Sequence, residues 1–243
     1  MISKDKLENP EQYRATVERL CEWYQRAFTL HEDGIRLICV DEKTGIQAIE
    51  RHHPNLPPQP GHSERLEAHY SRHGTCCLIA NFEVATGQVI APTLGPTRTE
   101  ADFVQHIRQT LQTDPDAKWV FILDQLNTHR SAGLVELVAE ECGLVEPLGE
   151  KGKTGILKSM KSRKAFLEDP THRIQFVYTP RHSSWLNQVE IWFSILTRRT
   201  LKRTSFKSVE DLQQRIRDFI EYFNAVLAKP FNWTYTGKPL QEA

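Results

Sequence analysis

The chain has 243 residues, of which 39% are hydrophobic and 26% charged, and its formal net charge is zero. This length suits one large domain, or one domain with a small appendage, and the composition excludes a collagenous, coiled-coil or wholly disordered chain. The longest apolar runs have about five residues, far fewer than the roughly 20 of a membrane-spanning helix. The first residues also lack the apolar centre of a signal peptide.

The cysteine content indicates a reducing compartment. There are five cysteines, an odd number, and no pair has the CxxC spacing. Neither a disulfide framework nor a thiolate zinc site is therefore expected. We expect a cytoplasmic protein.

The zero net charge conceals a basic segment. Residues 1–150 hold 14 Lys and Arg against 23 Asp and Glu, a net charge of −9. Residues 151–207 hold 13 against three, a net charge of +10, and residues 208–243 have a net charge of −1. A basic segment on a neutral chain indicates a polyanionic partner that touches one region. The alternative is a lysine-rich loop that is merely solvated.

The first half of the chain predicts one helix followed by several strands. Asn9 and Pro10 are typical of a helix start, and apolar residues follow at helical spacing to about residue 28. An apolar run over 35–41 predicts a buried strand, and Thr44 and Gly45 predict a turn into a second one. The strands expected in this half are 35–41, 46–49, 75–82 and 88–91, with an extended proline-rich loop over 52–62.

The second half alternates helices and strands. We expect helices over 99–111, 129–142, 184–201 and 208–227, strands over 119–124 and 173–178, and an irregular basic stretch over 149–170. Antiparallel strands followed by this alternation predict an α/β fold, a mixed sheet flanked by helices.

Two aspartates lie where two apolar strands end. Asp41 ends the first strand and Asp124 ends the strand over 119–124. In open α/β sheets, ligands gather outside the carboxyl ends of such strands. The alternative for Asp124 is a helix cap or turn residue.

A third carboxylate lies beside an apolar helix face. At about 100° per residue, the apolar arc comprises Trp185, Val189, Trp192, Phe193 and Leu196. Glu190 lies at the edge of this arc rather than opposite it, and a solvated glutamate is the alternative. Asn187, about one turn earlier, is expected to hydrogen-bond this carboxylate or a bound water.

Three carboxylates on three elements, beside a basic region, favour a site for hard cations. Mg²⁺ takes carboxylate oxygens and keeps water or phosphate oxygens in its other positions. Two such ions stabilise the attacking and leaving oxygens of a phosphodiester displacement. Without a cation, clustered carboxylates repel one another.

Three segments together resemble the acidic motifs of DDE transposases. They read VDEKTGIQ (40–47), ILDQLNTH (122–129) and YTPRHSSWLNQVEIWFSIL (178–196). The last is the most specific, with Pro180, Leu186, Asn187, Glu190 and Trp192 in the family's order. The resemblance covers about residues 35–205 and is nearest to the bacterial insertion-sequence branch of the mariner superfamily.

This resemblance implies a ribonuclease H-like fold and a catalytic, metal-binding triad of Asp41, Asp124 and Glu190. It implies Mg²⁺ or Mn²⁺ as cofactor, two ions in number, and a homodimer acting on DNA. The expected function is metal-dependent hydrolysis at transposon ends followed by strand transfer into target DNA. Two alternatives remain open: a DNA-binding transposase remnant without catalysis, and a ribonuclease H-like nuclease that cuts without joining.

The predicted organisation departs from the family in two places. Residues 1–33 form a helical linker, 34–207 the catalytic domain and 208–243 a C-terminal helix and tail. Mariner-type chains begin with helix-turn-helix modules, whereas one helix precedes the first strand here, so the sequence leaves open whether specific DNA reading is present. The 65 residues between Asp124 and Glu190 exceed the usual spacing, and the basic insertion at about 149–170 accounts for the excess.

The basic segment supplies the expected DNA contacts. Residues 151–164 contain six cations and no acid, which predicts a flexible arm that holds phosphates without reading bases. The DNA-binding residues expected are Lys151, Lys153, Lys158, Lys161, Arg163, Lys164, Arg198, Arg199, Lys202 and Arg203.

Overall fold

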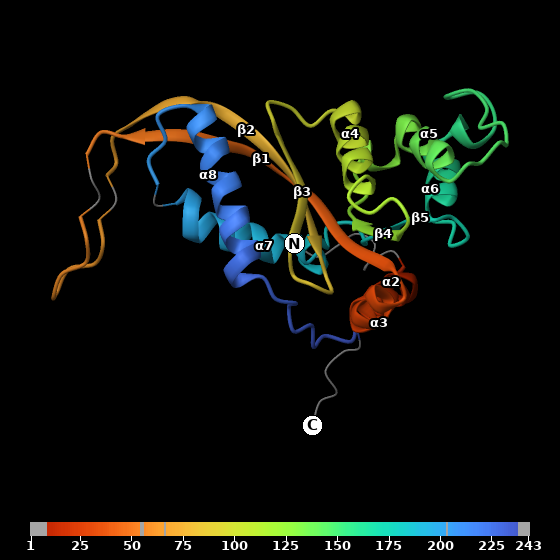
Figure 1. The fold of residues 1–243 in the computed structure, drawn as a ribbon, viewed down its shortest axis with the longest axis horizontal. Coiled ribbons are helices and arrows are strands. Elements are labelled where there is room, and N and C mark those ends of the chain that lie inside the picture. Colours follow the sequence, from red (N-terminus) through yellow and green to blue (C-terminus); the bar gives the residue numbers. More distant parts are fainter. Residues whose placement is uncertain (1–8, 54–55, 66, 203, 238–243) are drawn as a thin grey trace.

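A five-stranded mixed sheet organises the computed structural model, which describes residues 9–53, 56–65, 67–202 and 204–237 (Figure 1). Its strands lie in the order β3-β2-β1-β4-β5. β1 is antiparallel to β2 and parallel to β4, while β2–β3 is antiparallel and β4–β5 parallel. The strands are β1 (Ile35–Arg51), β2 (Tyr70–Glu83), β3 (Val89–Gly95), β4 (Lys118–Leu123) and β5 (Ile174–Tyr178). The predicted mixed sheet is confirmed.

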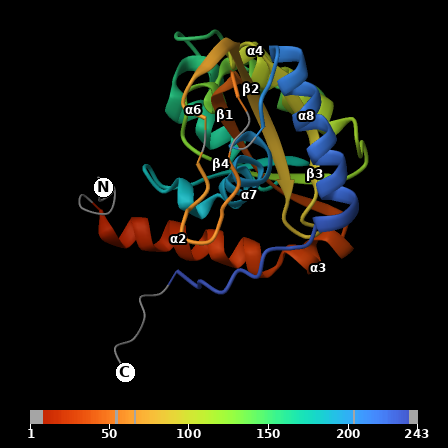
Figure 2. The same ribbon diagram turned by 90° about the vertical axis from the view of Figure 1, so that its left-hand side faces the viewer.

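Helices cover both faces of this sheet. The α2, α7 and α8 helices pack on one face and α4, α5 and α6 on the other (Figures 1 and 2). The alternation of β1 separates the two cores, since Leu37 faces the first group of helices and Ile38 the second. The helices are α2 (Pro10–Gln25), α3 (Ala27–Glu32), α4 (Glu100–Leu111), α5 (Ala132–Glu141), α6 (Met160–Leu167), α7 (Val189–Leu196) and α8 (Val209–Tyr222).

Local capping signals place the starts of α2 and α4 correctly. The Asn9 side chain accepts a hydrogen bond from the Gln12 backbone nitrogen at 3.1 Å, with Pro10 at the first helical position. Thr99 and Asp102 form a reciprocal capping box at the start of α4. The expected helix over 10–28 is in fact α2 followed by the short α3. None of the described helices is long and apolar enough to cross a bilayer.

The turn predicted at Thr44 and Gly45 is wrong. β1 runs without interruption through these residues, and its register with β2 shifts between Lys43 and Ile46. Gly45 has a φ of +63°, which glycine adopts without strain, so the glycine forms a bulge rather than a turn. The β1–β2 ribbon therefore extends well beyond the other strands (Figure 1).

The basic stretch over 149–170 contains regular structure. Residues Ile156–Lys158 form a 3-10 turn, and α6 follows with Ser159 as its capping residue. Leu157 and Leu167 are buried in the core shared with α4 and α5. The expectation of an irregular arm is therefore wrong for these residues, because apolar anchors pack them against the domain.

The helix predicted over 184–201 is broken in two. Ser184–Leu186 form a 3-10 turn, Asn187 adopts extended backbone angles, and α7 begins only at Val189. Val189, Trp192, Phe193 and Leu196 are buried as the predicted arc requires. Trp185 is 52% exposed, because the break at Asn187 takes it off the face of α7.

The last helix among the described residues was predicted well. The expected helix over 208–227 is α8, capped by Ser208, followed by a π-helical turn over Phe223–Leu227. Ile216 and Phe223 are among its buried residues.

Acid is expected to destabilise the fold through His106. This fully buried side chain shares a 2.8 Å hydrogen bond between Nδ1 and the Thr93 hydroxyl, and burial lowers its pKa from 6.5 to about 3, helped by the charge of His129. Because the unfolded chain takes up this proton below pH 6.5 and the folded chain does not, stability present above that pH is lost as pH falls towards 3.

The pH dependence of the His106→Gln variant tests this expectation. The unfolding free energy of the parent should fall by up to about 1.4 kcal/mol per pH unit more steeply than that of the variant. Urea denaturation of both proteins between pH 6.5 and 4 measures the two slopes. Parallel slopes would show that His106 is not buried as the neutral imidazole.

Candidate active site

Asp41 and Asp124 lie at the same level on neighbouring strands. β1 and β4 are parallel, and Cys39 pairs with Ile122, so each aspartate lies two residues beyond this pair. Local backbone bonds orient both side chains: the Glu42 nitrogen donates to Oδ1 of Asp41 at 2.8 Å, and the Leu126 nitrogen donates to Oδ1 of Asp124 at 2.9 Å. The sheet therefore brings together two residues 83 positions apart.

Glu190 enters the same region from the first turn of α7. The start of α7 is attached to β1 by Asn187, whose Nδ2 donates to the Val40 carbonyl oxygen at 2.9 Å. The amide nitrogen of Asn187 therefore binds the backbone next to Asp41, whereas the expected contact was with the Glu190 carboxylate or a bound water. The buried Oδ1 of Asn187 has no hydrogen-bond partner among the described residues.

Electrostatics link the three carboxylates. Burial raises the pKa of Asp41 from 3.8 to about 7, and the negative charges of Asp124, Glu42 and Glu190 raise it further, against the opposing hydrogen bond from the Glu42 backbone. Asp124 and Glu190, the other two acids predicted from the sequence, therefore both lie within electrostatic range of Asp41. A buried cluster of like charges of this kind favours a cation.

The chemistry of this donor set fits a divalent cation. Carboxylate oxygens are the ligands that Mg²⁺ prefers, and a cation would offset the burial and repulsion that hold Asp41 partly protonated. In the described part of the chain, no three acidic, histidine or cysteine side chains are gathered closely enough to coordinate one ion as they stand. The carboxylates would therefore have to draw closer together on binding.

A buried histidine joins Asp124 to the neighbouring strand. His129, in the 3-10 turn Thr128–Arg130, places Nδ1 at 2.8 Å from Oδ1 of Asp124 and Nε2 at 3.0 Å from Oε1 of Glu42. The His129 side chain is fully buried and packs against Phe103, with ring centroids 4.3 Å apart. Glu42 is only 2% exposed, whereas Asp124 is 44% exposed.

The two carboxylates keep His129 charged and Asp124 ionised. Burial opposes the charge on His129, but its hydrogen bonds to Asp124 and Glu42 outweigh this effect and raise its pKa from 6.5 to about 9. Burial likewise opposes ionisation of Asp124, yet the hydrogen bond from His129 lowers the pKa of that carboxyl below its usual value. Asp124 is therefore held as a carboxylate in a fixed orientation.

Sequence reasoning missed both His129 and Glu42. Each lies inside a motif that carries the resemblance to transposases, but only the aspartates in those motifs were assigned roles. The alternation of β1 indicates that Glu42 points to the face opposite Asp41. Nothing local indicates that His129 reaches Glu42, since the two residues are 87 positions apart.

The expected DNA-binding residues fall into two separate groups. The residues between 151 and 164 belong to the α6 side of the sheet. Arg198, Arg199 and Lys202 follow α7 on the opposite side (Figure 1). Lys151, Lys153 and Lys164 form ion pairs with Glu100, Glu150 and Glu168. Lys158 and Lys161 are exposed, as are Arg198, Arg199 and Lys202, while Arg203 lies outside the described residues.

Arg163 has a structural environment. Its guanidinium is buried and donates to the carbonyl oxygens of Arg130 at 2.8 Å and Leu157 at 3.0 Å. The bond to Arg130 attaches α6 to the turn that carries His129. Arg163 is therefore removed from the set of expected DNA contacts, because its donors are used within the fold.

The fold and the site define a class of protein. It is an α/β domain in which the central parallel strands carry acidic residues just beyond their buried segments. Residues 36–213 match the family model described as "DDE superfamily endonuclease". The chain belongs to this family. No curated protein matches the chain.

Solved structures of the Mos1 mariner transposase share the fold. The paired-end complex with Mn is 16% identical with a TM-score of 0.57, covering 91% of this chain and 56% of that one. The catalytic domain of Mos1 is 14% identical with a TM-score of 0.53, covering 91% of this chain and 83% of that domain. This similarity confirms the ribonuclease H-like α/β fold, and the chain spans 56% of the first Mos1 protein.

Proposed function

We propose that this chain is the catalytic domain of a DNA transposase of the bacterial insertion-sequence branch. It hydrolyses a phosphodiester at the transposon end and transfers the strand into target DNA. The observation that carries the proposal is the placement of Asp41 and Asp124 at one level on neighbouring parallel strands, with Glu190 in electrostatic range. Membership of the DDE endonuclease family supports the same function.

In this proposal, Asp41, Asp124 and Glu190 hold two Mg²⁺ or Mn²⁺ ions. Such ions activate a water and stabilise the charge on the phosphate. Relatives support this choice of cofactor, since Mos1 structures contain Mn or Mg. The chain's own residues position the ligands: His129 orients Asp124, and Asn187 fixes the start of α7 against the backbone that precedes Asp41.

The proposed partner is DNA, bound by a homodimer in the cytoplasm. Mos1 relatives were solved with transposon ends, including the left end. The free thiols of the five cysteines agree with a reducing compartment.

A cleavage and joining assay tests the proposed function. Labelled duplex DNA carrying an element end is incubated with the protein and Mg²⁺ or Mn²⁺, and nicked and joined products are separated on a denaturing gel. Nicking followed by joining is the expected result. Nicking without joining favours a ribonuclease H-like nuclease, and binding without either favours the non-catalytic remnant.

The exposed lysines of the basic segment should govern the salt dependence of DNA binding. Lys151, Lys153, Lys158 and Lys161 are exposed, and each phosphate they neutralise adds about 0.9 to the slope of log affinity against log salt on duplex DNA. Replacing all four with Gln should reduce that slope by about 3 if at least three make contacts. Fluorescence anisotropy at several salt concentrations measures it.

The control for this prediction is stability. Exposed charges each contribute about 1 kcal/mol or less, so the melting temperature of the quadruple variant should stay close to that of the parent. Identical slopes for the two folded proteins would mean that this segment does not bind DNA.

A further inference from the structure

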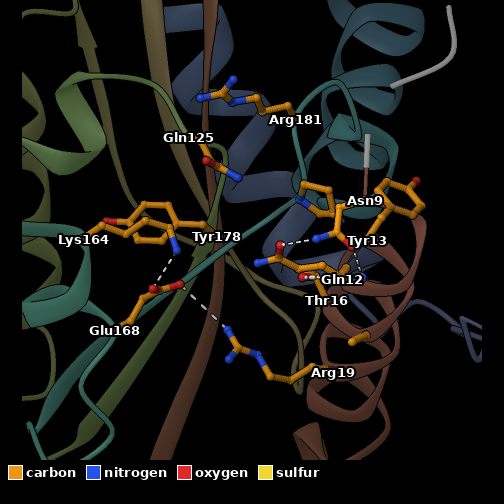
Figure 3. A pocket seen from close by; sticks show the side chains of 12 residues that line it. Asn9, Gln12, Tyr13, Thr16, Arg19, Gln125, Lys164, Glu168, Tyr178 and Arg181 are labelled. Atoms are coloured by element: carbon orange, nitrogen blue, oxygen red, sulfur yellow. Dashed lines mark hydrogen bonds and ion pairs between the residues drawn. The ribbon is translucent and has the colours of Figure 1, made fainter. Parts of the chain in front are cut away.

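A polar groove opens between α2 and α6 (Figure 3). Its volume is about 720 Å³, and Gln125, the residue after Asp124, lies in its wall. Tyr178 and Pro180, where β5 ends, complete the wall on that side. The groove is therefore at the carboxyl ends of β4 and β5, where open α/β sheets bind their ligands.

One wall of the groove is a continuous face of α2. Gln12, Thr16 and Arg19 recur every three or four residues, which places them on the same side of the helix. The opposite wall carries Lys164 and Glu168 from α6, and Arg181 comes from the loop after β5. Figure 3 shows that these side chains come from three segments far apart in the sequence, with Arg181 at the opposite end of the groove from Arg19.

The groove is cationic. Its lining contains Arg19, Lys164 and Arg181 against one carboxylate, Glu168, so its formal charge is +2. Glu168 accepts from Lys164 at 2.6 Å and lies 3.9 Å from Arg19 across the groove. Lys164 also lies over the Tyr178 ring, 5.2 Å from its centroid. Because Arg19 is 55% exposed and its ion pair is long, its guanidinium is accessible to an incoming anion.

Neutral hydrogen-bonding groups lie among these charges. The lining includes the side-chain amides of Asn9, Gln12 and Gln125. Within the fold, Nδ2 of Asn9 donates to Oε1 of Gln12 at 3.1 Å, and Nε2 of Gln125 donates to the Thr179 carbonyl oxygen at 3.0 Å. The amide nitrogen of Gln12 and the amide oxygen of Gln125 are therefore the groups that can face a ligand. Amides can both donate to and accept from the edges of a base, whereas arginine and lysine bind phosphate. A volume of about 720 Å³ lies within the range of about 300–1,000 Å³ for small-ligand sites, which suits a nucleotide or two of one strand.

We propose that this groove binds unpaired nucleotides of the DNA strand that leads into the candidate active site. Arg19 and Arg181 hold the phosphates, and the amides of Gln12 and Gln125 face the bases. The Watson–Crick edge of a base is open to these amides only when the strand is unpaired. The volume of about 720 Å³ suits a nucleotide or two of one strand rather than the width of a duplex. The inference rests on the proposed function, since it takes Asp124 as part of the site that the strand enters.

The test compares two DNAs with the same duplex sequence, one blunt and one with a short single-stranded tail. Affinity is measured by fluorescence anisotropy at several salt concentrations in EDTA, so that no cleavage occurs. The parent should prefer the tailed DNA. Arg19→Gln should weaken binding to the tailed DNA and reduce its salt slope by about 0.7, the value for one phosphate on a single strand.

Two further variants sharpen the comparison. Arg14→Gln makes the same charge change on the opposite, exposed face of α2 and should leave the preference for the tail unchanged. Glu168→Gln removes the one carboxylate of the groove and should strengthen binding to the tailed DNA. The two groove variants therefore shift affinity in opposite directions.

Each outcome decides the proposal. Equal effects of Arg19→Gln and Arg14→Gln on the tailed DNA would overturn it, and so would equal weakening of tailed and blunt DNA by Arg19→Gln, which indicates a duplex contact. Failure of the proposed function is seen separately. If the parent protein prefers the tailed DNA but never cleaves with Mg²⁺ or Mn²⁺, the proposed transposase function is refuted. The proposed nucleotide binding in the groove then still stands.

Discussion

Asp124→Asn is expected to abolish Mg²⁺- or Mn²⁺-dependent cleavage of DNA and to leave DNA binding intact or tighter. The substitution preserves size but removes the negative charge that a divalent ion requires of its ligand. The loss should be at least about 10²- to 10³-fold, the effect of removing one group that stabilises charge in a transition state. Binding should not weaken, because removing a negative charge reduces repulsion of phosphate.

Asp116→Asn is the matched control. Asp116 is exposed, lies shortly before β4 and undergoes the same chemical change. Initial rates of nicking on identical DNA compare the two variants, and anisotropy compares their affinities. Cleavage by Asp124→Asn at the rate of the Asp116 variant would show that Asp124 is not a metal ligand, and the proposed mechanism would fail.

His129→Ala is expected to lower the unfolding free energy by about 3–5 kcal/mol, the cost of breaking a buried ion pair by removing one partner. The main cause is Glu42, which is 2% exposed and would lose the imidazole 3.0 Å away. Asp124 contributes less, because at 44% exposure water can solvate it. Guanidinium denaturation at pH 7 measures the change.

Two comparisons separate lost charge pairing from lost volume. His106→Ala removes an equally buried imidazole that contacts the Thr93 hydroxyl rather than a carboxylate. This substitution should therefore lower the unfolding free energy by less than His129→Ala does. Glu42→Gln combined with His129→Ala should recover part of the loss, since no buried charge remains unpaired. Equal costs for the two alanine variants, with no recovery in the double variant, would refute the ion-pair account.

The position of the groove connects these experiments. Gln125 lines the groove and directly follows Asp124, and its carbonyl oxygen accepts from the Arg130 side chain. Arg163 of α6 donates to the Arg130 carbonyl oxygen and so attaches the turn of His129 to α6. A substitution that loosens His129 should therefore also disturb the wall that contains Lys164. DNA-binding measurements on the His129 variant are best made well below its denaturation midpoint.

The sequence by itself determined the features that depend on neighbours along the chain. Asn9, Thr99 and Ser208 cap helices because their side chains reach backbone nitrogens two or three residues ahead. The apolar runs before Asp41 and Asp124 predicted two buried strands, and the carboxyl ends of parallel strands meet at one edge of a sheet. For this reason the candidate site was predictable as two aspartates at one edge.

Only the tertiary structure decided the features that depend on contacts between distant segments. Gly45 forms a bulge rather than a turn because β2 pairs with β1 on both sides of it. Residues 156–167 are ordered because Leu157 and Leu167 find a core on α4 and α5. His129 meets Glu42 because β1 and β4 are parallel neighbours, and strand order is a long-range choice that no local pattern records.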